Sequence, residues 1–317
     1  MKIIVFGASG FIGSAVSAHL SDEGHEVIRA VGPRSETHEE SFPIDISDFR
    51  SFPELRDLDA VVNCAGIAHR FGRVSADEFD RVNAQGARNV ARFAVESEAK
   101  TLVHISSVLV YGNRASPDPI DEHCEPRPED EYAQSKLLGE QAASDLCSDQ
   151  NIRLVILRPA PVIGEGSRGN VRRLIRAIDR RRFIWLGEGS NRKSLVYVGD
   201  VARAVARSLE VSASESRFNL VTGTTTMKHI VSVIADRLGK NIPTFTIPGT
   251  IGHAAGLGAA AASFLITGLD RNRRTLESWL SDDVYSGDAF STRFQFVPGT
   301  GIDDALRREV DDYLRNK

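Results

Sequence analysis

The chain has few cysteines, tryptophans and methionines, and almost no excess of either charge. Its 317 residues include 3 Cys, 2 Trp and 2 Met, and the formal net charge is −4. Three cysteines, odd in number and far apart, fit neither a disulfide framework nor a zinc site. We therefore expect no metal, and a reducing compartment, the cytoplasm. A net charge this small gives no polyelectrolyte surface, so neither nucleic acid nor an anionic membrane is an expected partner.

Long uncharged runs are also scarce, with one exception. Residues 251–269 are almost uncharged, rich in Ala and Gly, and close to the length needed to span a bilayer. His253 and four glycines weaken insertion. We expect a buried or amphipathic helix there, with membrane association as the alternative. Because the chain opens directly with an apolar run, we also expect no signal peptide.

Apolar runs with the look of buried strands alternate with helical patterns in the first half of the chain. This alternation predicts an α/β fold, a Rossmann-type doubly wound parallel sheet. With 41% hydrophobic residues, a chain of 317 can bury a sizeable core and is long for one domain. The predicted strands are Lys2–Phe6, Glu26–Ala30, Ala60–Asn63, Thr101–Ile105 and Arg153–Arg158, and the predicted helices are Ser14–Glu23, Ala76–Glu98 and Tyr132–Cys147.

A glycine triplet lies between the first predicted strand and the first predicted helix. Gly7 allows a tight turn, Gly10 allows a pyrophosphate to approach the backbone, and Gly13 allows the helix to pack closely on the strand. The spacing differs from the Gly-x-Gly-x-x-Gly of the standard dinucleotide fingerprint. Its position between strand and helix nevertheless favours a dinucleotide site.

Tyr132 and Lys136 are four residues apart, so on a helix they share one face. A free tyrosine has a pKa of about 10, and a neighbouring cation lowers it by favouring the phenolate. The pair is therefore a candidate acid–base device, although the same spacing is common on solvated helix faces.

With the run from His104 to Gly112, the glycine triplet and the Tyr132–Lys136 pair resemble the extended short-chain dehydrogenase/reductase family over nearly the whole chain. The resemblance implies that Ser107, rather than Ser106, is the catalytic hydroxyl. It also implies that Tyr132 exchanges the proton while Lys136 binds the nicotinamide ribose. Asn83 resembles the supporting asparagine of that family.

The resemblance also implies a set of residues around a nicotinamide dinucleotide. Where the family has an acid at the end of its second strand, this chain has Val31, followed by Arg34 and Ser35. An arginine and a hydroxyl suit a 2′-phosphate, so we expect NADP, with NAD as the alternative. Asp48 is expected to be a cap or a surface acid. The implied cofactor residues are Gly7, Ser9, Gly10, Phe11, Ile12, Gly13, Arg34, Asp45, Ile46, Cys64, Ala65, Gly66, Tyr132, Lys136, Pro159 and Val162.

The second half resembles the nucleotide-sugar branch of the family. That resemblance implies a UDP-sugar substrate, with Asn170 at its diphosphate or uracil side and Arg192 or Lys193 binding phosphate. Ser107 also contacts the sugar, and His69 either lines the sugar pocket or has a structural role. The basic stretch 172–182 is either a solvated helix face or a further diphosphate contact. We expect a dinucleotide-binding domain of residues 1–160 plus about 194–222, and a substrate-binding domain of about 161–193 plus 223–317.

Several reactions use the same Ser, Tyr and Lys. Dehydration needs an Asp-Glu pair directly after the hydroxyl residue, where this chain has Val108 and Leu109, so it is disfavoured. A 4-keto reductase is favoured over a 4-epimerase because of the NADP-like loop after the second strand. An alcohol dehydrogenase for apolar substrates and a cofactor-sensing regulator are further alternatives. The resemblance also suggests a homodimer.

Overall fold

The structure, a computed structural model, describes residues 1–33, 35, 41–68, 74–113, 118–148, 150, 152–211, 217–242, 246–247 and 281–317. Arg34, His69 and the stretch 251–269, on which three predictions fall, lie outside the described residues. Within the described ranges, no helix combines the length and the apolar character needed to cross a membrane.

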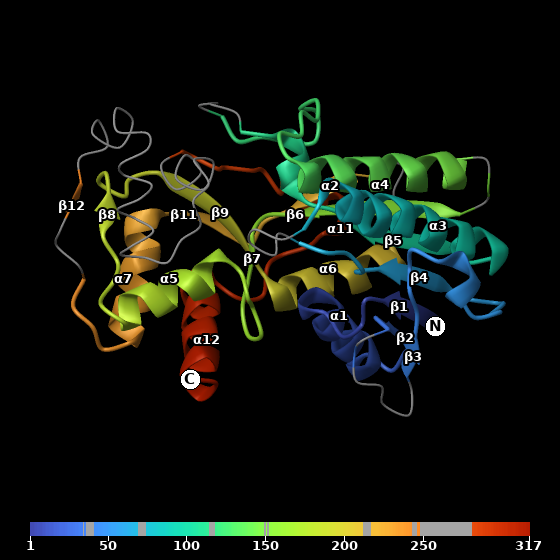
Figure 1. The fold of residues 1–317 in the computed structure, drawn as a ribbon, viewed down its shortest axis with the longest axis horizontal. Helices are drawn as coiled ribbons and strands as arrows, with labels where there is room; N and C mark the ends of the chain where they lie inside the picture. Colours follow the sequence, from blue (N-terminus) through green and yellow to red (C-terminus); the bar gives the residue numbers. More distant parts are fainter. Residues whose placement is uncertain are drawn as a thin grey trace.

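A seven-stranded sheet in the order β10-β6-β5-β4-β1-β2-β3 forms the centre of the larger lobe (Figure 1). Every neighbouring pair in it is parallel, as predicted, and strands far apart in sequence therefore end at one edge. The Rossmann-type fold class is confirmed. The strands are β1 Lys2–Phe6, β2 Glu26–Val31, β3 Ser41–Pro43, β4 Ala60–Asn63, β5 Thr101–Ile105, β6 Arg153–Pro159 and β10 Arg217–Leu220.

Helices cover both faces of this sheet. On one face α1 (Phe11–Asp22) packs on α6 (Val198–Glu210), and on the other α3 (Gly86–Glu96) packs on α4 (Glu131–Ser148) (Figure 1). This arrangement explains the continuous apolar run of β1, since both of its faces are buried. Ile3 and Val5 join the core beneath α1 and α6, while Ile4 and Phe6 join the core beneath α3 and α4.

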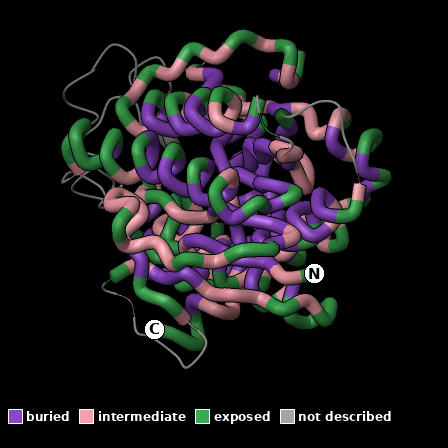
Figure 2. The backbone as a smooth tube through the Cα atoms, turned by 90° about the vertical axis from the view of Figure 1, so that its right-hand side faces the viewer, coloured by how far each residue is buried: buried purple, intermediate pink, exposed green. Residues whose placement is uncertain are grey.

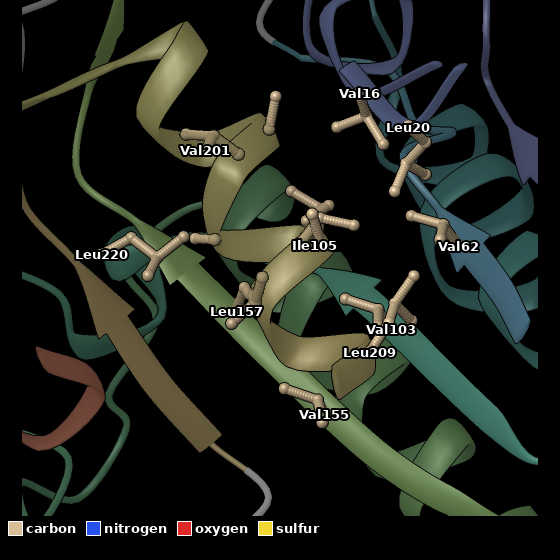
Figure 3. Close-up of a cluster of buried hydrophobic side chains, with 14 of the residues drawn as sticks. Val16, Leu20, Val62, Val103, Ile105, Val155, Leu157, Val201, Leu209 and Leu220 are labelled. Carbon is tan, nitrogen blue, oxygen red and sulfur yellow. The ribbon is translucent and has the colours of Figure 1, made fainter. Parts of the chain in front are cut away.

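The first of these cores is contiguous across the sheet. Figure 3 shows Val16 and Leu20 of α1 and Val201 and Leu209 of α6 around side chains of β4, β5 and β6. Each such fully buried aliphatic side chain contributes about 1.5–3 kcal/mol relative to an exposed one. Figure 2 shows the same concentration of buried residues in the interior of the molecule. The core thus fixes the strand ends that carry the predicted site.

One predicted helix is interrupted. The stretch expected as a single helix, Ala76–Glu98, consists of α2 (Ala76–Phe79), a π-helical turn η2 (Asp80–Gln85) and then α3. A π-turn holds one more residue than an α-turn, and such turns are frequent at functional sites. Two short 3₁₀ turns complete the lobe, η1 (Phe49–Ser51) and η3 (Val108–Tyr111).

A smaller lobe lies beside the first one (Figure 1). Its three-stranded sheet has the order β11-β9-β7, and a helical layer of α5, α7 and α12 packs around a second core. Its elements are β7 Val162–Ile163, α5 Asn170–Asp179, β8 Trp185–Leu186, β9 Arg192–Tyr197, β11 Gly223–Thr226, α7 Met227–Arg237, β12 Thr246–Ile247 and α12 Ile302–Arg315, with α11 Asp288–Phe294 packing on β10 of the large sheet.

The chain crosses between the lobes more than once. After β9 in the small sheet it forms α6 on the large one and then β10, which pairs with β6. The predicted domain boundaries remain predictions.

Candidate functional site

The carboxyl ends of β1, β4, β5 and β6 meet at one edge of the large sheet, where ligands bind in open parallel sheets. The turn after β1 fits its predicted role closely. Gly7 has a φ of +76°, which favours glycine, and its carbonyl accepts a hydrogen bond of 2.9 Å from the Gly10 amide. A Cβ on Gly13 would lie 2.1 Å from the Gly7 oxygen, so only glycine lets α1 pack this close.

The N-terminus of α1 has no side-chain cap. The first amides of a helix have no intrahelical partner, so those of Phe11 and Ile12 are available to an anion. Ser9 and Gly10, just before them, are exposed. The turn therefore fits the phosphates of a dinucleotide, as its glycine spacing predicts.

The loop after β4 lies against this turn. A Cβ on Gly7 would come within 2.7 Å of Ala65, and the Ala65 amide donates a 3.1 Å hydrogen bond to Asn63 Oδ1. That bond fixes the orientation of the Asn63 amide, whose Nδ2 then donates to His104 Nδ1 at 3.1 Å. His104 is therefore neutral with its proton on Nε2. Burial, and next the charge of Lys136, hold the pKa of His104 well below its usual range.

Asn83 lies on the π-helical turn and ties that turn to the same loop. Its Oδ1 accepts from the Ile67 amide at 2.8 Å, and its Nδ2 donates to the Ile67 carbonyl and to Ser135 Oγ, both at 3.0 Å. Gly66 passes between this side chain and Lys136, because a Cβ there would lie 3.0 Å from Asn83 Oδ1 and 3.9 Å from Lys136 Nζ. Asn83 therefore fixes the loop after β4 next to Lys136.

The two serines at the end of β5 have different partners. Ser107 Oγ accepts a 3.2 Å hydrogen bond from the Leu109 amide and is hydrogen-bonded to the Tyr132 hydroxyl. Ser106 Oγ instead donates to Glu140 Oε1 at 2.5 Å. The structure thus brings Ser107, and not Ser106, to the predicted proton carrier.

Tyr132 is half-buried, and its ring meets Phe79 edge to face at 5.9 Å between centroids. Burial raises the pKa of Tyr132 to about 12, and the Ser107 hydrogen bond only partly opposes this rise. Lys136 is not among the groups that shift it, which differs from the lowering expected from their spacing. Desolvation of the hydroxyl is the largest cause of the rise.

Lys136 is buried, and its Nζ donates a 2.6 Å hydrogen bond to the Ile105 carbonyl. Burial lowers the pKa of Lys136 to about 8, and the charge of Glu140 partly opposes this fall. Burial likewise raises the pKa of Cys64 to about 12, so that thiol is protonated at neutral pH. An ammonium and a neutral phenol therefore lie on one face of α4.

Other predicted cofactor residues border this site. Asp45 Oδ1 accepts from both the amide and the hydroxyl of Ser47, and Asn89 donates to the Ile46 carbonyl at 2.8 Å. Asp48 caps η1 through the Arg50 amide, which confirms its predicted role. Pro159 ends β6 and Val162 begins β7, where the chain leaves the large sheet.

The end of β2 bears on the choice between NAD and NADP. Val31 ends that strand, and Ser9 Oγ and Ser35 Oγ are hydrogen-bonded at 2.8 Å. Arg29 donates to the Ala8 carbonyl at 3.5 Å. Two hydroxyls therefore lie beside the glycine turn, and the strand ends without a carboxylate.

The predicted substrate residues of the smaller lobe lie on two elements. Asn170 is the exposed first residue of α5. Arg192 pairs with Asp282 at 2.9 Å, and the buried Lys193 pairs with Asp283 at 2.5 Å. Both cations thus already contact carboxylates from a segment about 90 residues later, which a diphosphate would have to share or displace.

The sequence analysis missed a buried ion pair next to the face of α4 that carries Tyr132 and Lys136. Glu140 and Arg158 form an ion pair with an N–O distance of 2.6 Å and are 1% and 2% exposed. The spacing contained a signal, because Glu140 follows Lys136 by four residues as Lys136 follows Tyr132. As for metals, the described part of the chain gathers no three His, Cys, Asp or Glu side chains into a potential site.

Comparisons with curated proteins agree with this geometry. The chain is 29% identical over 261 residues, 80% of its length and 78% of the relative, to N-acetyl-alpha-D-glucosaminyl-diphospho-ditrans,octacis-undecaprenol 4-epimerase of Escherichia coli O157:H7. It is 24% identical over 260 residues, 78% of each protein, to UDP-glucose 4-epimerase of Vibrio cholerae.

Among solved structures, UDP-glucuronic acid 4-epimerase from Bacillus cereus in complex with NAD shares the fold with a TM-score of 0.76. The alignment covers 100% of this chain and 99% of that one at 21% identity. Residues 3–220 match the model of the NAD dependent epimerase/dehydratase family. The match extends over more than half of the sequence and agrees with the three motifs from which the resemblance was inferred, so the chain belongs to the NAD dependent epimerase/dehydratase family.

Proposed function

We propose that the protein is a 4-epimerase of a sugar carried on a nucleoside diphosphate, with UDP-sugars as the first substrates to test. The observation that carries this proposal is the hydrogen bond between Ser107 and Tyr132, with Lys136 one helical turn further along α4. A hydroxyl, a phenol and an ammonium on adjacent elements can serve one oxygen atom of a substrate.

In this mechanism Ser107 hydrogen-bonds the reacting sugar oxygen and Tyr132 exchanges its proton. Epimerisation begins with removal of a proton from the sugar hydroxyl, so Tyr132 must act first as a base. In the protein without ligand, burial raises the pKa of Tyr132 to about 12. Proton removal by Tyr132 therefore requires added positive charge at the site, which a bound nicotinamide would supply and to which the Lys136 ammonium would contribute. A nicotinamide dinucleotide, when bound, supplies the hydride acceptor and donor. The glycine turn and the uncapped amides of α1 would hold its phosphates.

Two lines favour epimerisation over reduction. The family is NAD-dependent, and both curated relatives described above carry the name of a 4-epimerase. An epimerase returns the hydride to the same substrate and so keeps its cofactor.

A 4-keto reductase using NADP is the second candidate, as the sequence itself favoured. It is supported by the end of β2, where Val31 replaces an acid and the Ser9 and Ser35 hydroxyls meet. A carboxylate there would repel a 2′-phosphate, whereas hydroxyls can donate hydrogen bonds to it.

The deciding experiment has two measurements. Acid extraction of the purified protein followed by mass spectrometry identifies the retained cofactor as NAD or NADP. Incubation with UDP-sugars, and with N-acetylglucosaminyl diphospho-undecaprenol because of the Escherichia coli relative, is then run with and without NADPH. An isomer formed without NADPH consumption supports the epimerase; stoichiometric consumption supports the reductase instead. If every sugar is left unchanged while an apolar alcohol is oxidised, both proposals fail.

We further propose a cytoplasmic location and a homodimer, in line with the sequence. Light scattering of the purified protein tests the second: a mass near twice 34.6 kDa supports a dimer.

A further inference from the structure

Three polar side chains form one row along α4. Tyr132, Lys136 and Glu140 follow each other at intervals of four residues, so they occupy one face of the helix. The first two belong to the proposed reaction, whereas no step of it uses Glu140. Glu140 is also almost completely buried, with 1% of its side chain exposed. A buried carboxylate costs free energy unless its surroundings compensate it.

Most of the compensation comes from two strand ends, and Arg217 at the start of β10 adds a longer contact, with its Nε 3.8 Å from Oε2. Arg158 at the end of β6 donates to both carboxylate oxygens, from Nε at 2.9 Å and from Nη2 at 2.6 Å. Ser106 at the end of β5 donates its hydroxyl at 2.5 Å. Glu140 therefore joins α4 to the two strands whose ends flank the site, one residue before Ser107 and one before Pro159.

The hydrogen bonds continue beyond Arg158. Its Nη1 donates to the Tyr111 hydroxyl at 2.9 Å, and that hydroxyl donates to Asn219 Oδ1 at 2.9 Å. Tyr111 and Asn219 are fully buried. Because every member has a partner, the carboxylate of Glu140 has one defined orientation beside Lys136.

The titratable groups that act on Lys136 or respond to it come from three elements. They are Cys64 from the loop after β4, His104 from β5 and Glu140 from α4 itself. Cys64 and His104 are neutral at pH 7, as shown above. Glu140, paired with Arg158, is the member of this group whose charge opposes the effect of burial on Lys136.

We infer that Glu140 is a positioning residue that holds Lys136 in its ammonium form and fixes the end of β5 through Ser106. The carboxylate acts through Lys136 and Ser106 and does not touch the substrate. This inference depends on the proposed function only for what the lysine charge then does in the reaction. The protonation of Lys136 can be measured without any turnover.

The test is competitive labelling of the full-length protein with acetic anhydride between pH 6 and pH 10. Digestion and mass spectrometry give the acetylated fraction of Lys136 against that of Lys228, an exposed lysine on α7. In the wild type we expect a labelling midpoint near the Lys136 pKa of about 8. In Glu140→Gln the midpoint moves down by about one pH unit, because a nearby opposite charge is lost.

Two further variants make the result unambiguous. Glu140→Gln leaves Arg158 buried without a carboxylate, so the double variant Glu140→Gln/Arg158→Met removes both charges and is used if the single one does not fold. Its midpoint moves in the same direction by about half as much. Ser106→Ala is the matched control, since it removes a hydrogen bond to Glu140 and leaves its charge. Its midpoint stays at the wild-type value.

The same shift is expected in the alkaline limb of the pH profile of kcat. An unchanged midpoint in the folded Glu140 variants, or an equal shift in Ser106→Ala, overturns the inference. A protein inactive on every sugar of the panel would count against the proposed function, while the labelling of Lys136 would still decide the role of Glu140.

Discussion

The two lobes hold their charged side chains in different ways. In the larger lobe the Glu140–Arg158 pair is 1% and 2% exposed and fastened by further hydrogen bonds. In the smaller lobe Arg192 and Asp282 are 45% and 38% exposed. Exposed pairs contribute about 0–1 kcal/mol, whereas breaking a buried one costs about 3–5 kcal/mol. The Glu140–Arg158 pair is therefore fixed, whereas Arg192 can exchange Asp282 for an incoming anion at low cost.

This difference in burial suits two different functions, proton transfer and substrate binding. Proton transfer needs atoms held within a fraction of an ångström, which the α4 row and its strand-end contacts provide. A substrate that must enter and leave needs contacts that can form and break, which a paired but accessible cation such as Arg192 provides. The following experiments test this contrast, from the largest expected effect to the smallest.

The strongest effect is expected at Tyr132, in the larger lobe. Tyr132→Phe removes the proton carrier, so turnover should fall about 10³-fold, equivalent to about 4 kcal/mol. Cofactor affinity should change little, because the ring and its contact with Phe79 remain. Steady-state kinetics and a cofactor titration measure both. Tyr313→Phe, which loses a hydroxyl bonded to Asp179 in the smaller lobe, is the matched control. Normal turnover in Tyr132→Phe would refute its assignment.

The second effect concerns stability. Glu140→Ala leaves Arg158 as a buried, uncompensated cation, so we expect the free energy of unfolding to fall by about 3–4 kcal/mol in urea denaturation. Glu96→Ala breaks the exposed Arg92–Glu96 pair and should change it by less than about 0.5 kcal/mol. Equal losses in the two variants would mean that burial does not distinguish the pairs.

The third effect concerns Glu309, a buried carboxyl group on α12 of the smaller lobe. Glu309 accepts from the Gly164 amide at 2.9 Å, and burial raises its pKa from 4.5 to about 7. Between these pH values the folded chain binds a proton that the unfolded chain does not. The stability present below pH 4.5 is therefore lost as pH rises to about 7, by about 3 kcal/mol.

Glu309→Gln removes this dependence, because the amide accepts the same hydrogen bonds without ionising. Relative to the wild type, the variant should gain about 3 kcal/mol in unfolding free energy as pH rises from 4.5 to above 7. Urea titrations at several pH values give the difference directly. A difference that is constant with pH would place the Glu309 pKa near its ordinary value.

The smallest effect is expected at Lys193, in the smaller lobe. Lys193→Met leaves Asp283 without its cation and should cost about 2 kcal/mol of stability, since the pair is only partly buried. The double variant Lys193→Met/Asp283→Asn should recover most of that loss. If Lys193 contacts the diphosphate, the double variant raises KM for the sugar about 10-fold with kcat unchanged. An unchanged KM would show that Lys193 does not bind the diphosphate.

Features with local signals could be predicted from sequence, whereas contacts between distant residues could not. The strands and the glycine turn were predicted because their signals are local: an apolar run buried on both faces, and three glycines at fixed spacing. Ser107 was chosen over Ser106 from a family pattern, and the two serines do have different partners. These features depend on short stretches that fold against a regular sheet.

The rest depends on partners distant in sequence or on burial. Nothing near Lys193 indicates that Asp283, 90 residues later, neutralises it. The spacing of Tyr132 and Lys136 predicts that they share a face but contains no information about desolvation, which raises the tyrosine pKa. The turn Asp80–Gln85 reads as ordinary helix, since its π geometry accompanies contacts of Asn83 with Ile67 and Ser135 that no local pattern encodes.

That π-turn sets a constraint on how this segment can vary. Each residue added to or removed from a helix rotates everything beyond it by about 100°. The extra residue in η2 thus sets the angular phase between α2, whose Phe79 meets Tyr132, and α3, which packs on α4. The length of this turn cannot change without moving Asn83 away from the loop it anchors.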